Sequence, residues 1–254
     1  MSHLIAVGIG NTTVSFGAHD LDACGYGRWH TSFACETTNL DPGLLAVKLP
    51  QTKCRWCVAS VNRPAEQRLA DWVRAARPED YYRTLCHTDL PLEANVEQPE
   101  RVGMDRLVAA LAANRLRDPS RPAIIVDAGT AITVDLVDAS GVFQGGAILP
   151  GFRLVARALA SGTDQLPEAD SLFASQAPTV VGKSTVDAIR SGLFWGGVGA
   201  INELVRRTTK ELSTNPQLFV AGGDTGLLAE HLSGDAVFEP DLVLHGILLA
   251  AGAD

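Results

Sequence analysis

The chain repeats one short pattern, and this repeat limits its possible folds more than any other feature. VGIGNTTVSF (residues 7–16) and VDAGTAITVD (residues 126–135) align without a gap, so that Gly10 matches Gly129. In both copies a run rich in β-branched residues enters a glycine turn and an alternating run leaves it, which is typical of two strands joined by a tight turn. The repeat therefore predicts two similar halves. The alternative is a coincidence between two ordinary strand–turn–strand segments.

The remaining pattern fits this division. RDPSRP (residues 117–122) is typical of a linker, so we expect an N-terminal half over residues 1–117 and a C-terminal half over residues 118–254. Each half is expected to begin with three antiparallel strands, which in the first half are Leu4–Ile9, Thr13–Ala18 and Tyr26–Phe33. Strands and helices then alternate, which predicts an α/β fold with a mixed, helix-flanked sheet in each half. Ligands of such folds are expected in the cleft between the halves.

Each glycine turn is suited to phosphate, because glycine lets backbone N–H groups approach phosphate oxygens closely. The candidate nucleotide-binding residues of the two turns are Gly8, Ile9, Gly10, Asn11, Thr12, Thr13, Val14, Ser15, Gly129 and Thr130. Asp127 precedes the second turn and is a candidate cation ligand, because a carboxylate that faces phosphates needs a cation between its own charge and theirs. The alternative role of Asp127 is to cap the turn. Gly8 stands at the matching position of the first copy, which therefore lacks this carboxylate.

A second candidate site lies in PERVGMDRLVAALAAN (residues 99–114), where Asp105 and Arg106 open a predicted helix. The positive end of a helix favours an ionised carboxylate, and Asp105 could then accept a proton from a hydroxyl group. Arg106 could bind a carboxylate or a phosphate. The alternative is an ordinary acidic helix start beside a surface arginine.

Composition excludes several classes of protein. A net charge of −8 without long charged runs argues against nucleic acid and anionic membranes as partners, and no apolar run is long enough to span a bilayer. Five cysteines and no secretory signal predict reduced thiols in the cytoplasm. Cys54 and Cys57 form a CxxC pair, which could be a redox or zinc site or simply two positions of one buried strand. No second CxxC and no helix directly after the pair are found in the sequence, which favours the buried strand. The six histidines lack paired spacing, which argues against a histidine metal site.

Six motifs occur in the order and spacing of type III pantothenate kinases: GMDR, VDAGTAITVD, GGAILPG, GKSTVDAIRSG, AGGDTGLLAE and EPDLVLHGILLA. Nearly the whole chain resembles this family. The resemblance implies two actin-like (ribonuclease H-like) domains, the fold shared by acetate and sugar kinases, heat-shock ATPases and actin. It implies ATP-dependent phosphorylation of pantothenate to 4'-phosphopantothenate, the first step towards coenzyme A. It also implies Mg²⁺, a monovalent cation (K⁺ or NH₄⁺) and a homodimer.

Carried over by position, the resemblance implies roles for individual residues. Asp105 would be the catalytic base for the primary hydroxyl of pantothenate, and Asp127 would bind the monovalent cation. Gly222 and Gly223 would lie near the adenosine of ATP. The residues implied to bind pantothenate are Val96, Gly103, Met104, Asp105, Arg106 and Thr185.

The chain departs from the family at three places. The family pattern DxGNT reads GIGNT here, with Gly8 in place of the aspartate, and Asp20 and Asp22 lie beyond the next strand. Val96 stands about where the family often has a tyrosine, and Ala221 replaces the threonine of a Thr-Gly-Gly motif. Loss of one charge-stabilising contact predicts a weak kinase. The alternatives are a catalytically impaired homologue that acts as a binding or regulatory protein, and a kinase of another small hydroxylated acid.

Overall fold

A computed structural model of the chain describes residues 3–21, 29–167, 176–228, 230–232, 234 and 236–252. The chain forms two compact units, Met1–Leu116 with Asp241–Asp254, and Arg117–Pro240. The sequence placed the division after residue 117 and assigned residues 118–254 to the second half. In the structure, Asp241–Asp254 belongs to the first unit.

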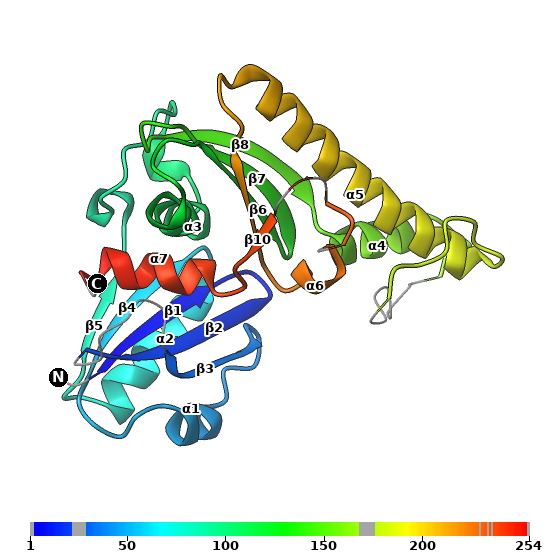
Figure 1. The fold of residues 1–254 in the computed structure, drawn as a ribbon. Coiled ribbons are helices and arrows are strands. Elements are labelled where there is room, and N and C mark those ends of the chain that lie inside the picture. The colour runs from blue at the N-terminus through cyan, green and yellow to red at the C-terminus, as the bar shows by residue number, and fades with distance from the viewer. Residues whose placement is uncertain are drawn as a thin grey trace. The chain divides into compact units, whose positions relative to one another are not determined.

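The first unit contains a five-stranded sheet with helices on both faces (Figure 1). Its strands are β1 (His3–Ile9), β2 (Thr13–Asp20), β3 (Trp29–Glu36), β4 (Cys54–Ser60) and β5 (Tyr81–Thr84). Its helices are α1 (Pro42–Lys48), α2 (Arg63–Ala76), η1 (His87–Asp89), η2 (Pro99–Arg101), α3 (Met104–Leu116) and α7 (Leu242–Ala250). The strand order is β3-β2-β1-β4-β5, with β1 antiparallel to β2 and parallel to β4. Residues 26–28 of the expected third strand lie outside the described residues.

The second unit repeats this topology. Its strands are β6 (Ala123–Ala128), β7 (Ala131–Val137), β8 (Phe143–Pro150), β9 (Gln217–Ala221) and β10 (Ala236–Phe238), and its helices are α4 (Phe152–Ser161), α5 (Thr185–Glu211) and α6 (Thr225–Leu228). The order β10-β9-β6-β7-β8, read from β8, matches that of the first sheet. The directions match as well, because β6 is antiparallel to β7 and parallel to β9. The predicted duplicated α/β fold is confirmed.

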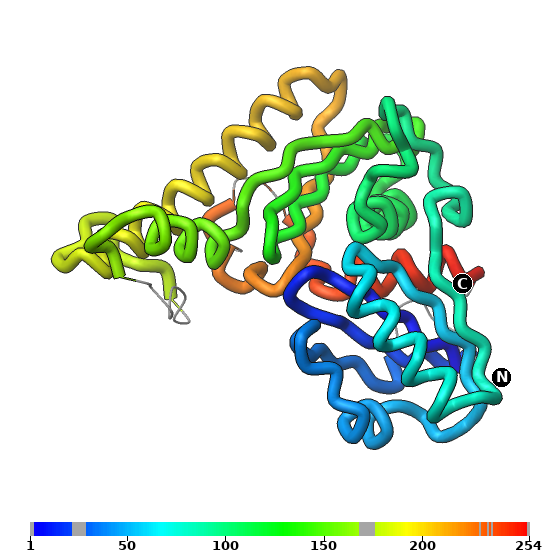
Figure 2. Tube along the Cα trace, turned by 180° about the vertical axis from the view of Figure 1, so that it is seen from behind, coloured from blue at the N-terminus to red at the C-terminus, as the bar shows by residue number. Residues whose placement is uncertain are grey.

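Packing on both faces explains why the central strand of the first sheet is almost continuously apolar. Leu4, Ile5, Ala6 and Val7 of β1 have no exposed surface, as expected for a strand covered on both sides. Helices α1 and α2 pack on one face, where α2 begins at the N-cap Asn62 and lies over the strands (Figure 2). Helices α3 and α7 pack together on the other face.

The CxxC pair belongs to this buried core. Cys54 and Cys57 are both buried in β4, and residues three apart in a strand point to opposite faces. Burial raises the pKa of Cys57 to about 11, so this thiol is neutral at neutral pH and a poor nucleophile. The buried-strand interpretation is therefore confirmed. Among the described helices, none combines the length and the hydropathy needed to cross a bilayer.

Candidate active site

The first glycine turn joins β1 to β2 and exposes a cluster of polar groups. The N–H of Gly10 donates to the Thr13 carbonyl oxygen at 2.9 Å, and the Thr37 hydroxyl donates to the Gly10 carbonyl at 3.1 Å. Asn11, Thr12 and Thr13 are exposed. The turn is thus held by its own backbone and by Thr37, while its side-chain donors face solvent. Val14 and Ser15 continue into β2, and Val14 is buried in the core.

Gly8 is the penultimate residue of β1, and Asp127 is the penultimate residue of β6. Each pairs with the strand that follows its turn, Gly8 with Ser15 and Asp127 with Thr133. The two positions therefore match in their place at the strand end, while the hairpin pairing differs by one residue, because the repeat aligns Ser15 with Val134 and Asp127 pairs with Thr133. A Cβ at Gly8 would lie 3.0 Å from Cγ1 of Val243 on α7, so a side chain added there requires Val243 to move.

The sheet register also locates the nearby acidic residues. Asp20 pairs with His3 at the opposite end of β1, so it cannot replace a carboxylate at Gly8; Asp22 lies outside the described residues. Glu36 pairs with Thr13 beside the turn and is exposed. Paired residues and alternate residues share a face of a sheet, so Glu36 and Gly8 lie on the same face. Glu36 could not be identified from the sequence, because only the pairing of β2 with β3 brings this carboxylate to the turn.

Asp105 lies in the first turn of α3 and is partly buried. Its Oδ1 accepts the N–H of Arg106 at 2.8 Å. A Cβ at Gly103 would lie 2.5 Å from the same Oδ1, so the glycine leaves the space that the carboxylate occupies. Burial raises the pKa of Asp105, although the N–H and the guanidinium of Arg106 oppose this shift. The helix end was expected to favour the ionised form; in the structure desolvation outweighs it.

Two further predicted pantothenate ligands belong to the same unit. Met104 is the first residue of α3 and is partly buried. Val96 lies in the loop between η1 and η2, also partly buried. The first unit thus carries the glycine turn, the loop of Val96 and the residues from Gly103 to Arg106.

The second unit builds a tighter version of the glycine turn. The N–H of Gly129 donates to the Ala131 carbonyl at 3.0 Å, and the N–H of Gly151 donates to the Thr130 carbonyl at 3.0 Å. Two residues separate β6 from β7, whereas three separate β1 from β2. Asp127 is partly buried beside this turn.

Gly222 follows β9 and lies against Asp127. Its φ is +95°, which favours glycine, and an added Cβ would lie 2.5 Å from Oδ1 of Asp127 and closer still to the Ala128 carbonyl oxygen. Gly223 is exposed and has open space at its Cβ position. The two glycines expected near the adenosine therefore differ: Gly222 makes room for the Asp127 carboxylate, and Gly223 faces open space.

Asp224 is a candidate that the sequence reasoning missed, although it stands inside the AGGDTG motif. Its N–H donates to the Ala128 carbonyl at 3.1 Å, so its backbone is fixed beside the second turn. Burial raises the pKa of Asp224, and Arg153 on α4 opposes the shift. The motif contained the signal, but only the hydrogen bond to Ala128 connects this residue with the strand that carries Asp127.

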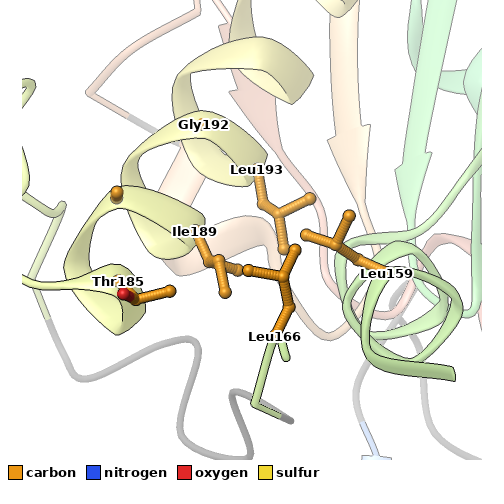
Figure 3. A pocket seen from close by; sticks show the side chains of 7 residues that line it. Leu159, Leu166, Thr185, Ile189, Gly192 and Leu193 are labelled. Atoms are coloured by element: carbon orange, nitrogen blue, oxygen red, sulfur yellow. The ribbon is translucent and has the colours of Figure 1, made fainter. Parts of the chain in front are cut away.

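Thr185 is the first residue of α5, preceded by the N-cap Ser184, whose side chain accepts the N–H of Asp187 at 3.1 Å. Thr185 lines an open, mainly apolar pocket of about 410 Å³ between α4 and α5 (Figure 3). The other lining residues are Leu159, Leu166, Ala188, Ile189, Gly192 and Leu193. The hydroxyl of Thr185 is thus a polar group at the edge of an apolar surface.

Each unit thus carries a glycine turn at the end of its first hairpin. The second unit adds the partly buried carboxylate of Asp127, and the first adds the partly buried Asp105 beside Arg106. The sequence model of the type III pantothenate kinase family matches residues 4–207. The chain belongs to the type III pantothenate kinase family.

Members of the family resemble this chain over most of its length. The type III pantothenate kinase of Rhodopirellula baltica is 40% identical over 80% of this chain and 77% of its own. That of Alkalilimnicola ehrlichii is 34% identical over 97% of both chains. The family resemblance inferred from the six motifs is confirmed.

Two solved structures share the fold at low sequence identity. The activator of 2-hydroxyisocaproyl-CoA dehydratase from Clostridium difficile, solved with bound ADPNP, matches with a TM-score of 0.53 and 13% identity over 99% of this chain and 94% of its own. The ethanolamine utilization protein EutJ from Carboxydothermus hydrogenoformans matches with a TM-score of 0.53 and 15% identity over 98% and 90%. At this identity they support the fold of the family member and carry no argument about its substrate.

Proposed function

We propose that this family member phosphorylates pantothenate with ATP to give 4'-phosphopantothenate, the first step of coenzyme A biosynthesis. The observation that carries the proposal is the Asp105 carboxylate, partly buried at the start of α3 in the space left by Gly103. Family membership supports pantothenate as the alcohol and ATP as the phosphoryl donor.

Asp105 acts as the general base in this proposal. Its carboxylate takes the proton of the primary hydroxyl, whose oxygen attacks the γ-phosphorus of ATP as the bond to the β-phosphate oxygen breaks. Burial raises the pKa of Asp105, which makes the carboxylate a stronger base than an exposed aspartate. Arg106 binds the polar groups of pantothenate and keeps the carboxylate oriented through its N–H.

The two glycine turns bind the phosphates of ATP. Gly10, Asn11 and Thr12 contribute from the first turn, and Gly129 and Thr130 from the second. The N–H groups of Gly10 and Gly129 close the turns, so the two glycines contribute by letting phosphate oxygens approach the backbone closely, while Asn11 and Thr12 contribute exposed polar side chains. Asp127 holds the monovalent cation, K⁺ or NH₄⁺, whose charge offsets that of the phosphates. Gly222 supports this role, since it leaves space for the Asp127 carboxylate.

The first turn fits a divalent cation less well. Gly8 offers no carboxylate at the end of β1, and Asp20 lies at the far end of the strand pair. We therefore expect weak Mg²⁺ affinity and a slow phosphoryl transfer, since catalysis of this reaction depends on charge neutralisation. Glu36, exposed on the same face beside the turn, is the carboxylate available to offset part of this loss.

We infer that the enzyme is a cytoplasmic homodimer. The support lies on α5, where Gly192, Gly196 and Gly199 are exposed and have open space at their Cβ positions. Their spacing places them along one side of the helix, so a second copy could approach the backbone closely.

The proposal is tested by measuring ATP-dependent phosphorylation of pantothenate with Mg²⁺ and K⁺ or NH₄⁺. Pantothenate is compared with other small hydroxylated acids under the same conditions, and the parent with Asp105→Asn. Turnover of pantothenate that disappears in Asp105→Asn supports the proposal. A preference for another acid contradicts the substrate assignment, and an Asp105→Asn protein as active as the parent removes the base. Nucleotide binding without turnover, also after Gly8→Asp, would indicate a binding protein.

A further inference from the structure

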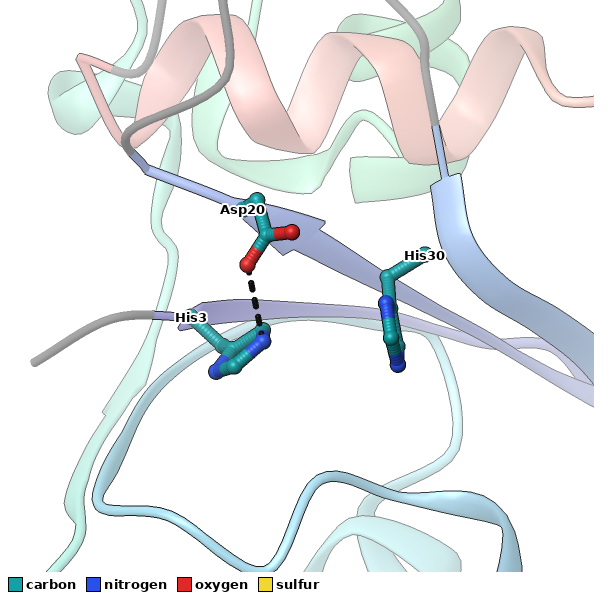
Figure 4. A group of neighbouring side chains, drawn as sticks. All are labelled: His3, Asp20 and His30. Carbon is teal, nitrogen blue, oxygen red and sulfur yellow. Dashed lines mark ion pairs between the residues drawn. The ribbon is translucent and has the colours of Figure 1, made fainter.

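Two histidines and an aspartate meet at the edge of the first unit, away from the glycine turn (Figure 4). His3 begins β1, Asp20 ends β2, and His30 is the second residue of β3. One ligand atom from each lies within 4.8 Å of the other two. None of these residues has a part in the proposed kinase reaction, because the glycine turn lies at the other end of β1 and β2.

Sheet register brings His3 and Asp20 together. The two residues are cross-strand partners, and Nε2 of His3 lies 2.8 Å from Oδ1 of Asp20. Paired residues share a face of the sheet, so this contact follows from the alignment of β1 with β2.

A β-bulge adds His30 to the pair. Ala18 pairs with Thr31 and His19 pairs with Trp29, which leaves His30 as an extra residue between two pairs. Such a bulge redirects side chains: Trp29 stacks on His245 of α7, while the His30 ring lies 5.6 Å from the His3 ring. Without the bulge, alternation would place His30 opposite His19, on the face that does not carry His3 and Asp20.

The His3 ring is already oriented as metal-bound histidines usually are. Its Nδ1 lies 2.9 Å from the hydroxyl oxygen of Thr52. When the Nδ1 proton is donated to Thr52, Nε2 keeps its lone pair for a ligand on the side of Asp20 and His30. The His3 side chain is 14% exposed and that of Asp20 45%, so one ligand is fixed by packing while the other two are open to entering ions.

The donor set selects the kind of ion. Two imidazoles and one carboxylate suit Zn²⁺ and neighbouring first-row divalent ions better than Mg²⁺ or Ca²⁺, which prefer oxygen ligands. Tetrahedral zinc with bonds of about 2.0–2.1 Å holds its ligand atoms about 3.3 Å apart. The exposed His30 side chain can close the remaining distance by rotation about its side-chain bonds.

We propose that His3, Asp20 and His30 form a non-catalytic binding site for a divalent transition-metal ion of the zinc class, with water as the fourth ligand. Binding releases the proton between His3 Nε2 and Asp20 to solvent and joins the ends of three strands. The site does not depend on the proposed kinase activity.

The test uses the full chain with Zn²⁺ and, for its spectrum, Co²⁺, in saturating Mg²⁺. We expect one Zn²⁺ per chain in calorimetry, a rise in melting temperature that a chelator reverses, and a Co²⁺ spectrum without thiolate charge transfer. His30→Ala and Asp20→Asn each lower the affinity at least about tenfold, since each removes one of three protein ligands. His87→Ala, which removes a partly buried histidine of η1 in the same unit, leaves the affinity unchanged.

Structural damage is separated from ligand loss by two further readouts. His30 is exposed, so His30→Ala should melt like the parent without metal and keep the parent's Mg²⁺-dependent kinase rate. The proposal is overturned if the parent binds no Zn²⁺, if His30→Ala and His87→Ala bind it equally, or if the Co²⁺ spectrum shows a cysteine ligand.

Discussion

Replacing Gly8 by aspartate tests the role of the missing carboxylate at the end of β1. Gly8 is not among the glycines with a positive φ, so its backbone accepts a side chain. The obstacle is Val243, whose Cγ1 would lie 3.0 Å from the new Cβ. Gly8→Asp should therefore be made both alone and together with Val243→Ala.

The packing gives the expected effect on stability. Inserting atoms into a filled site destabilises by about 1–3 kcal/mol, while replacing glycine restricts the unfolded chain and returns about 0.4–1 kcal/mol. Gly8→Asp alone should thus lower the free energy of unfolding by roughly 0–2.6 kcal/mol. Val243→Ala removes the contacting methyl group, so adding Gly8→Asp to it should destabilise less than adding Gly8→Asp to the parent.

The expected effect on catalysis is larger. One preorganised charge-stabilising contact is worth on the order of 10²–10³ in rate, so the double variant should gain about that factor in kcat/KM over Val243→Ala. The measurement is the phosphorylation rate of pantothenate as Mg²⁺ is titrated, with unfolding followed in parallel. Gly8→Asn is the matched control, because it fills the same space without the charge. If the double variant is folded and its rate equals that of the asparagine control, the charge argument is wrong.

Four other outcomes can be measured with the same assays. Asp105→Asn should lower kcat by about 10²–10⁴-fold, the usual contribution of a general base. The same variant should have a higher melting temperature than the parent at neutral pH. Burial raises the pKa of Asp105, so ionisation of this carboxyl group favours the unfolded state, and asparagine removes that cost. For the same reason kcat/KM of the parent should fall with decreasing pH at a midpoint above that of an ordinary aspartate, and a midpoint at or below it would contradict the burial argument. Gly103→Ala should fold but lose tenfold or more in rate, roughly the cost of a displaced base, because its Cβ would displace Oδ1 of Asp105; a folded variant with the parent's rate would contradict this. Gly222→Ala should lower the free energy of unfolding by about 1–3 kcal/mol more than Gly234→Ala, since both have a positive φ but only Gly222 also contacts the Ala128 backbone; equal losses would remove the packing explanation.

The sequence predicted the fold well because its strongest signal was a repeat. The two copies mark the first hairpin of each sheet, and Gly8 and Asp127 are each the penultimate residue of its first strand. Local chemistry also located the start of α3. Such features depend on neighbours in the chain, which a sequence displays directly.

Features that depend on the pairing of distant strands could not be predicted in this way. Glu36 reaches the first turn only because β3 pairs with β2, and His30 meets His3 only because of a bulge. The spacing of the six histidines argued against a metal site. His3 and His30 come together across strands, and such proximity does not appear as a spacing along the chain. The assignment of α7 to the first unit also depends on distant parts of the chain, because α7 packs on α3 and β1, which lie far away in the sequence.

The two halves differ in the space beside the matching strand ends. In the second unit the Asp127 carboxylate occupies the space that Gly222 leaves, because an added Cβ there would lie 2.5 Å from its Oδ1. In the first unit the space beside Gly8 borders a methyl group of Val243. A carboxylate at position 8 would therefore press on Val243, so we expect the residues at positions 8 and 243 to be coupled. This coupling predicts that the effects of Gly8→Asp and Val243→Ala on stability are not additive; additive effects would show that the side chain at position 8 avoids α7.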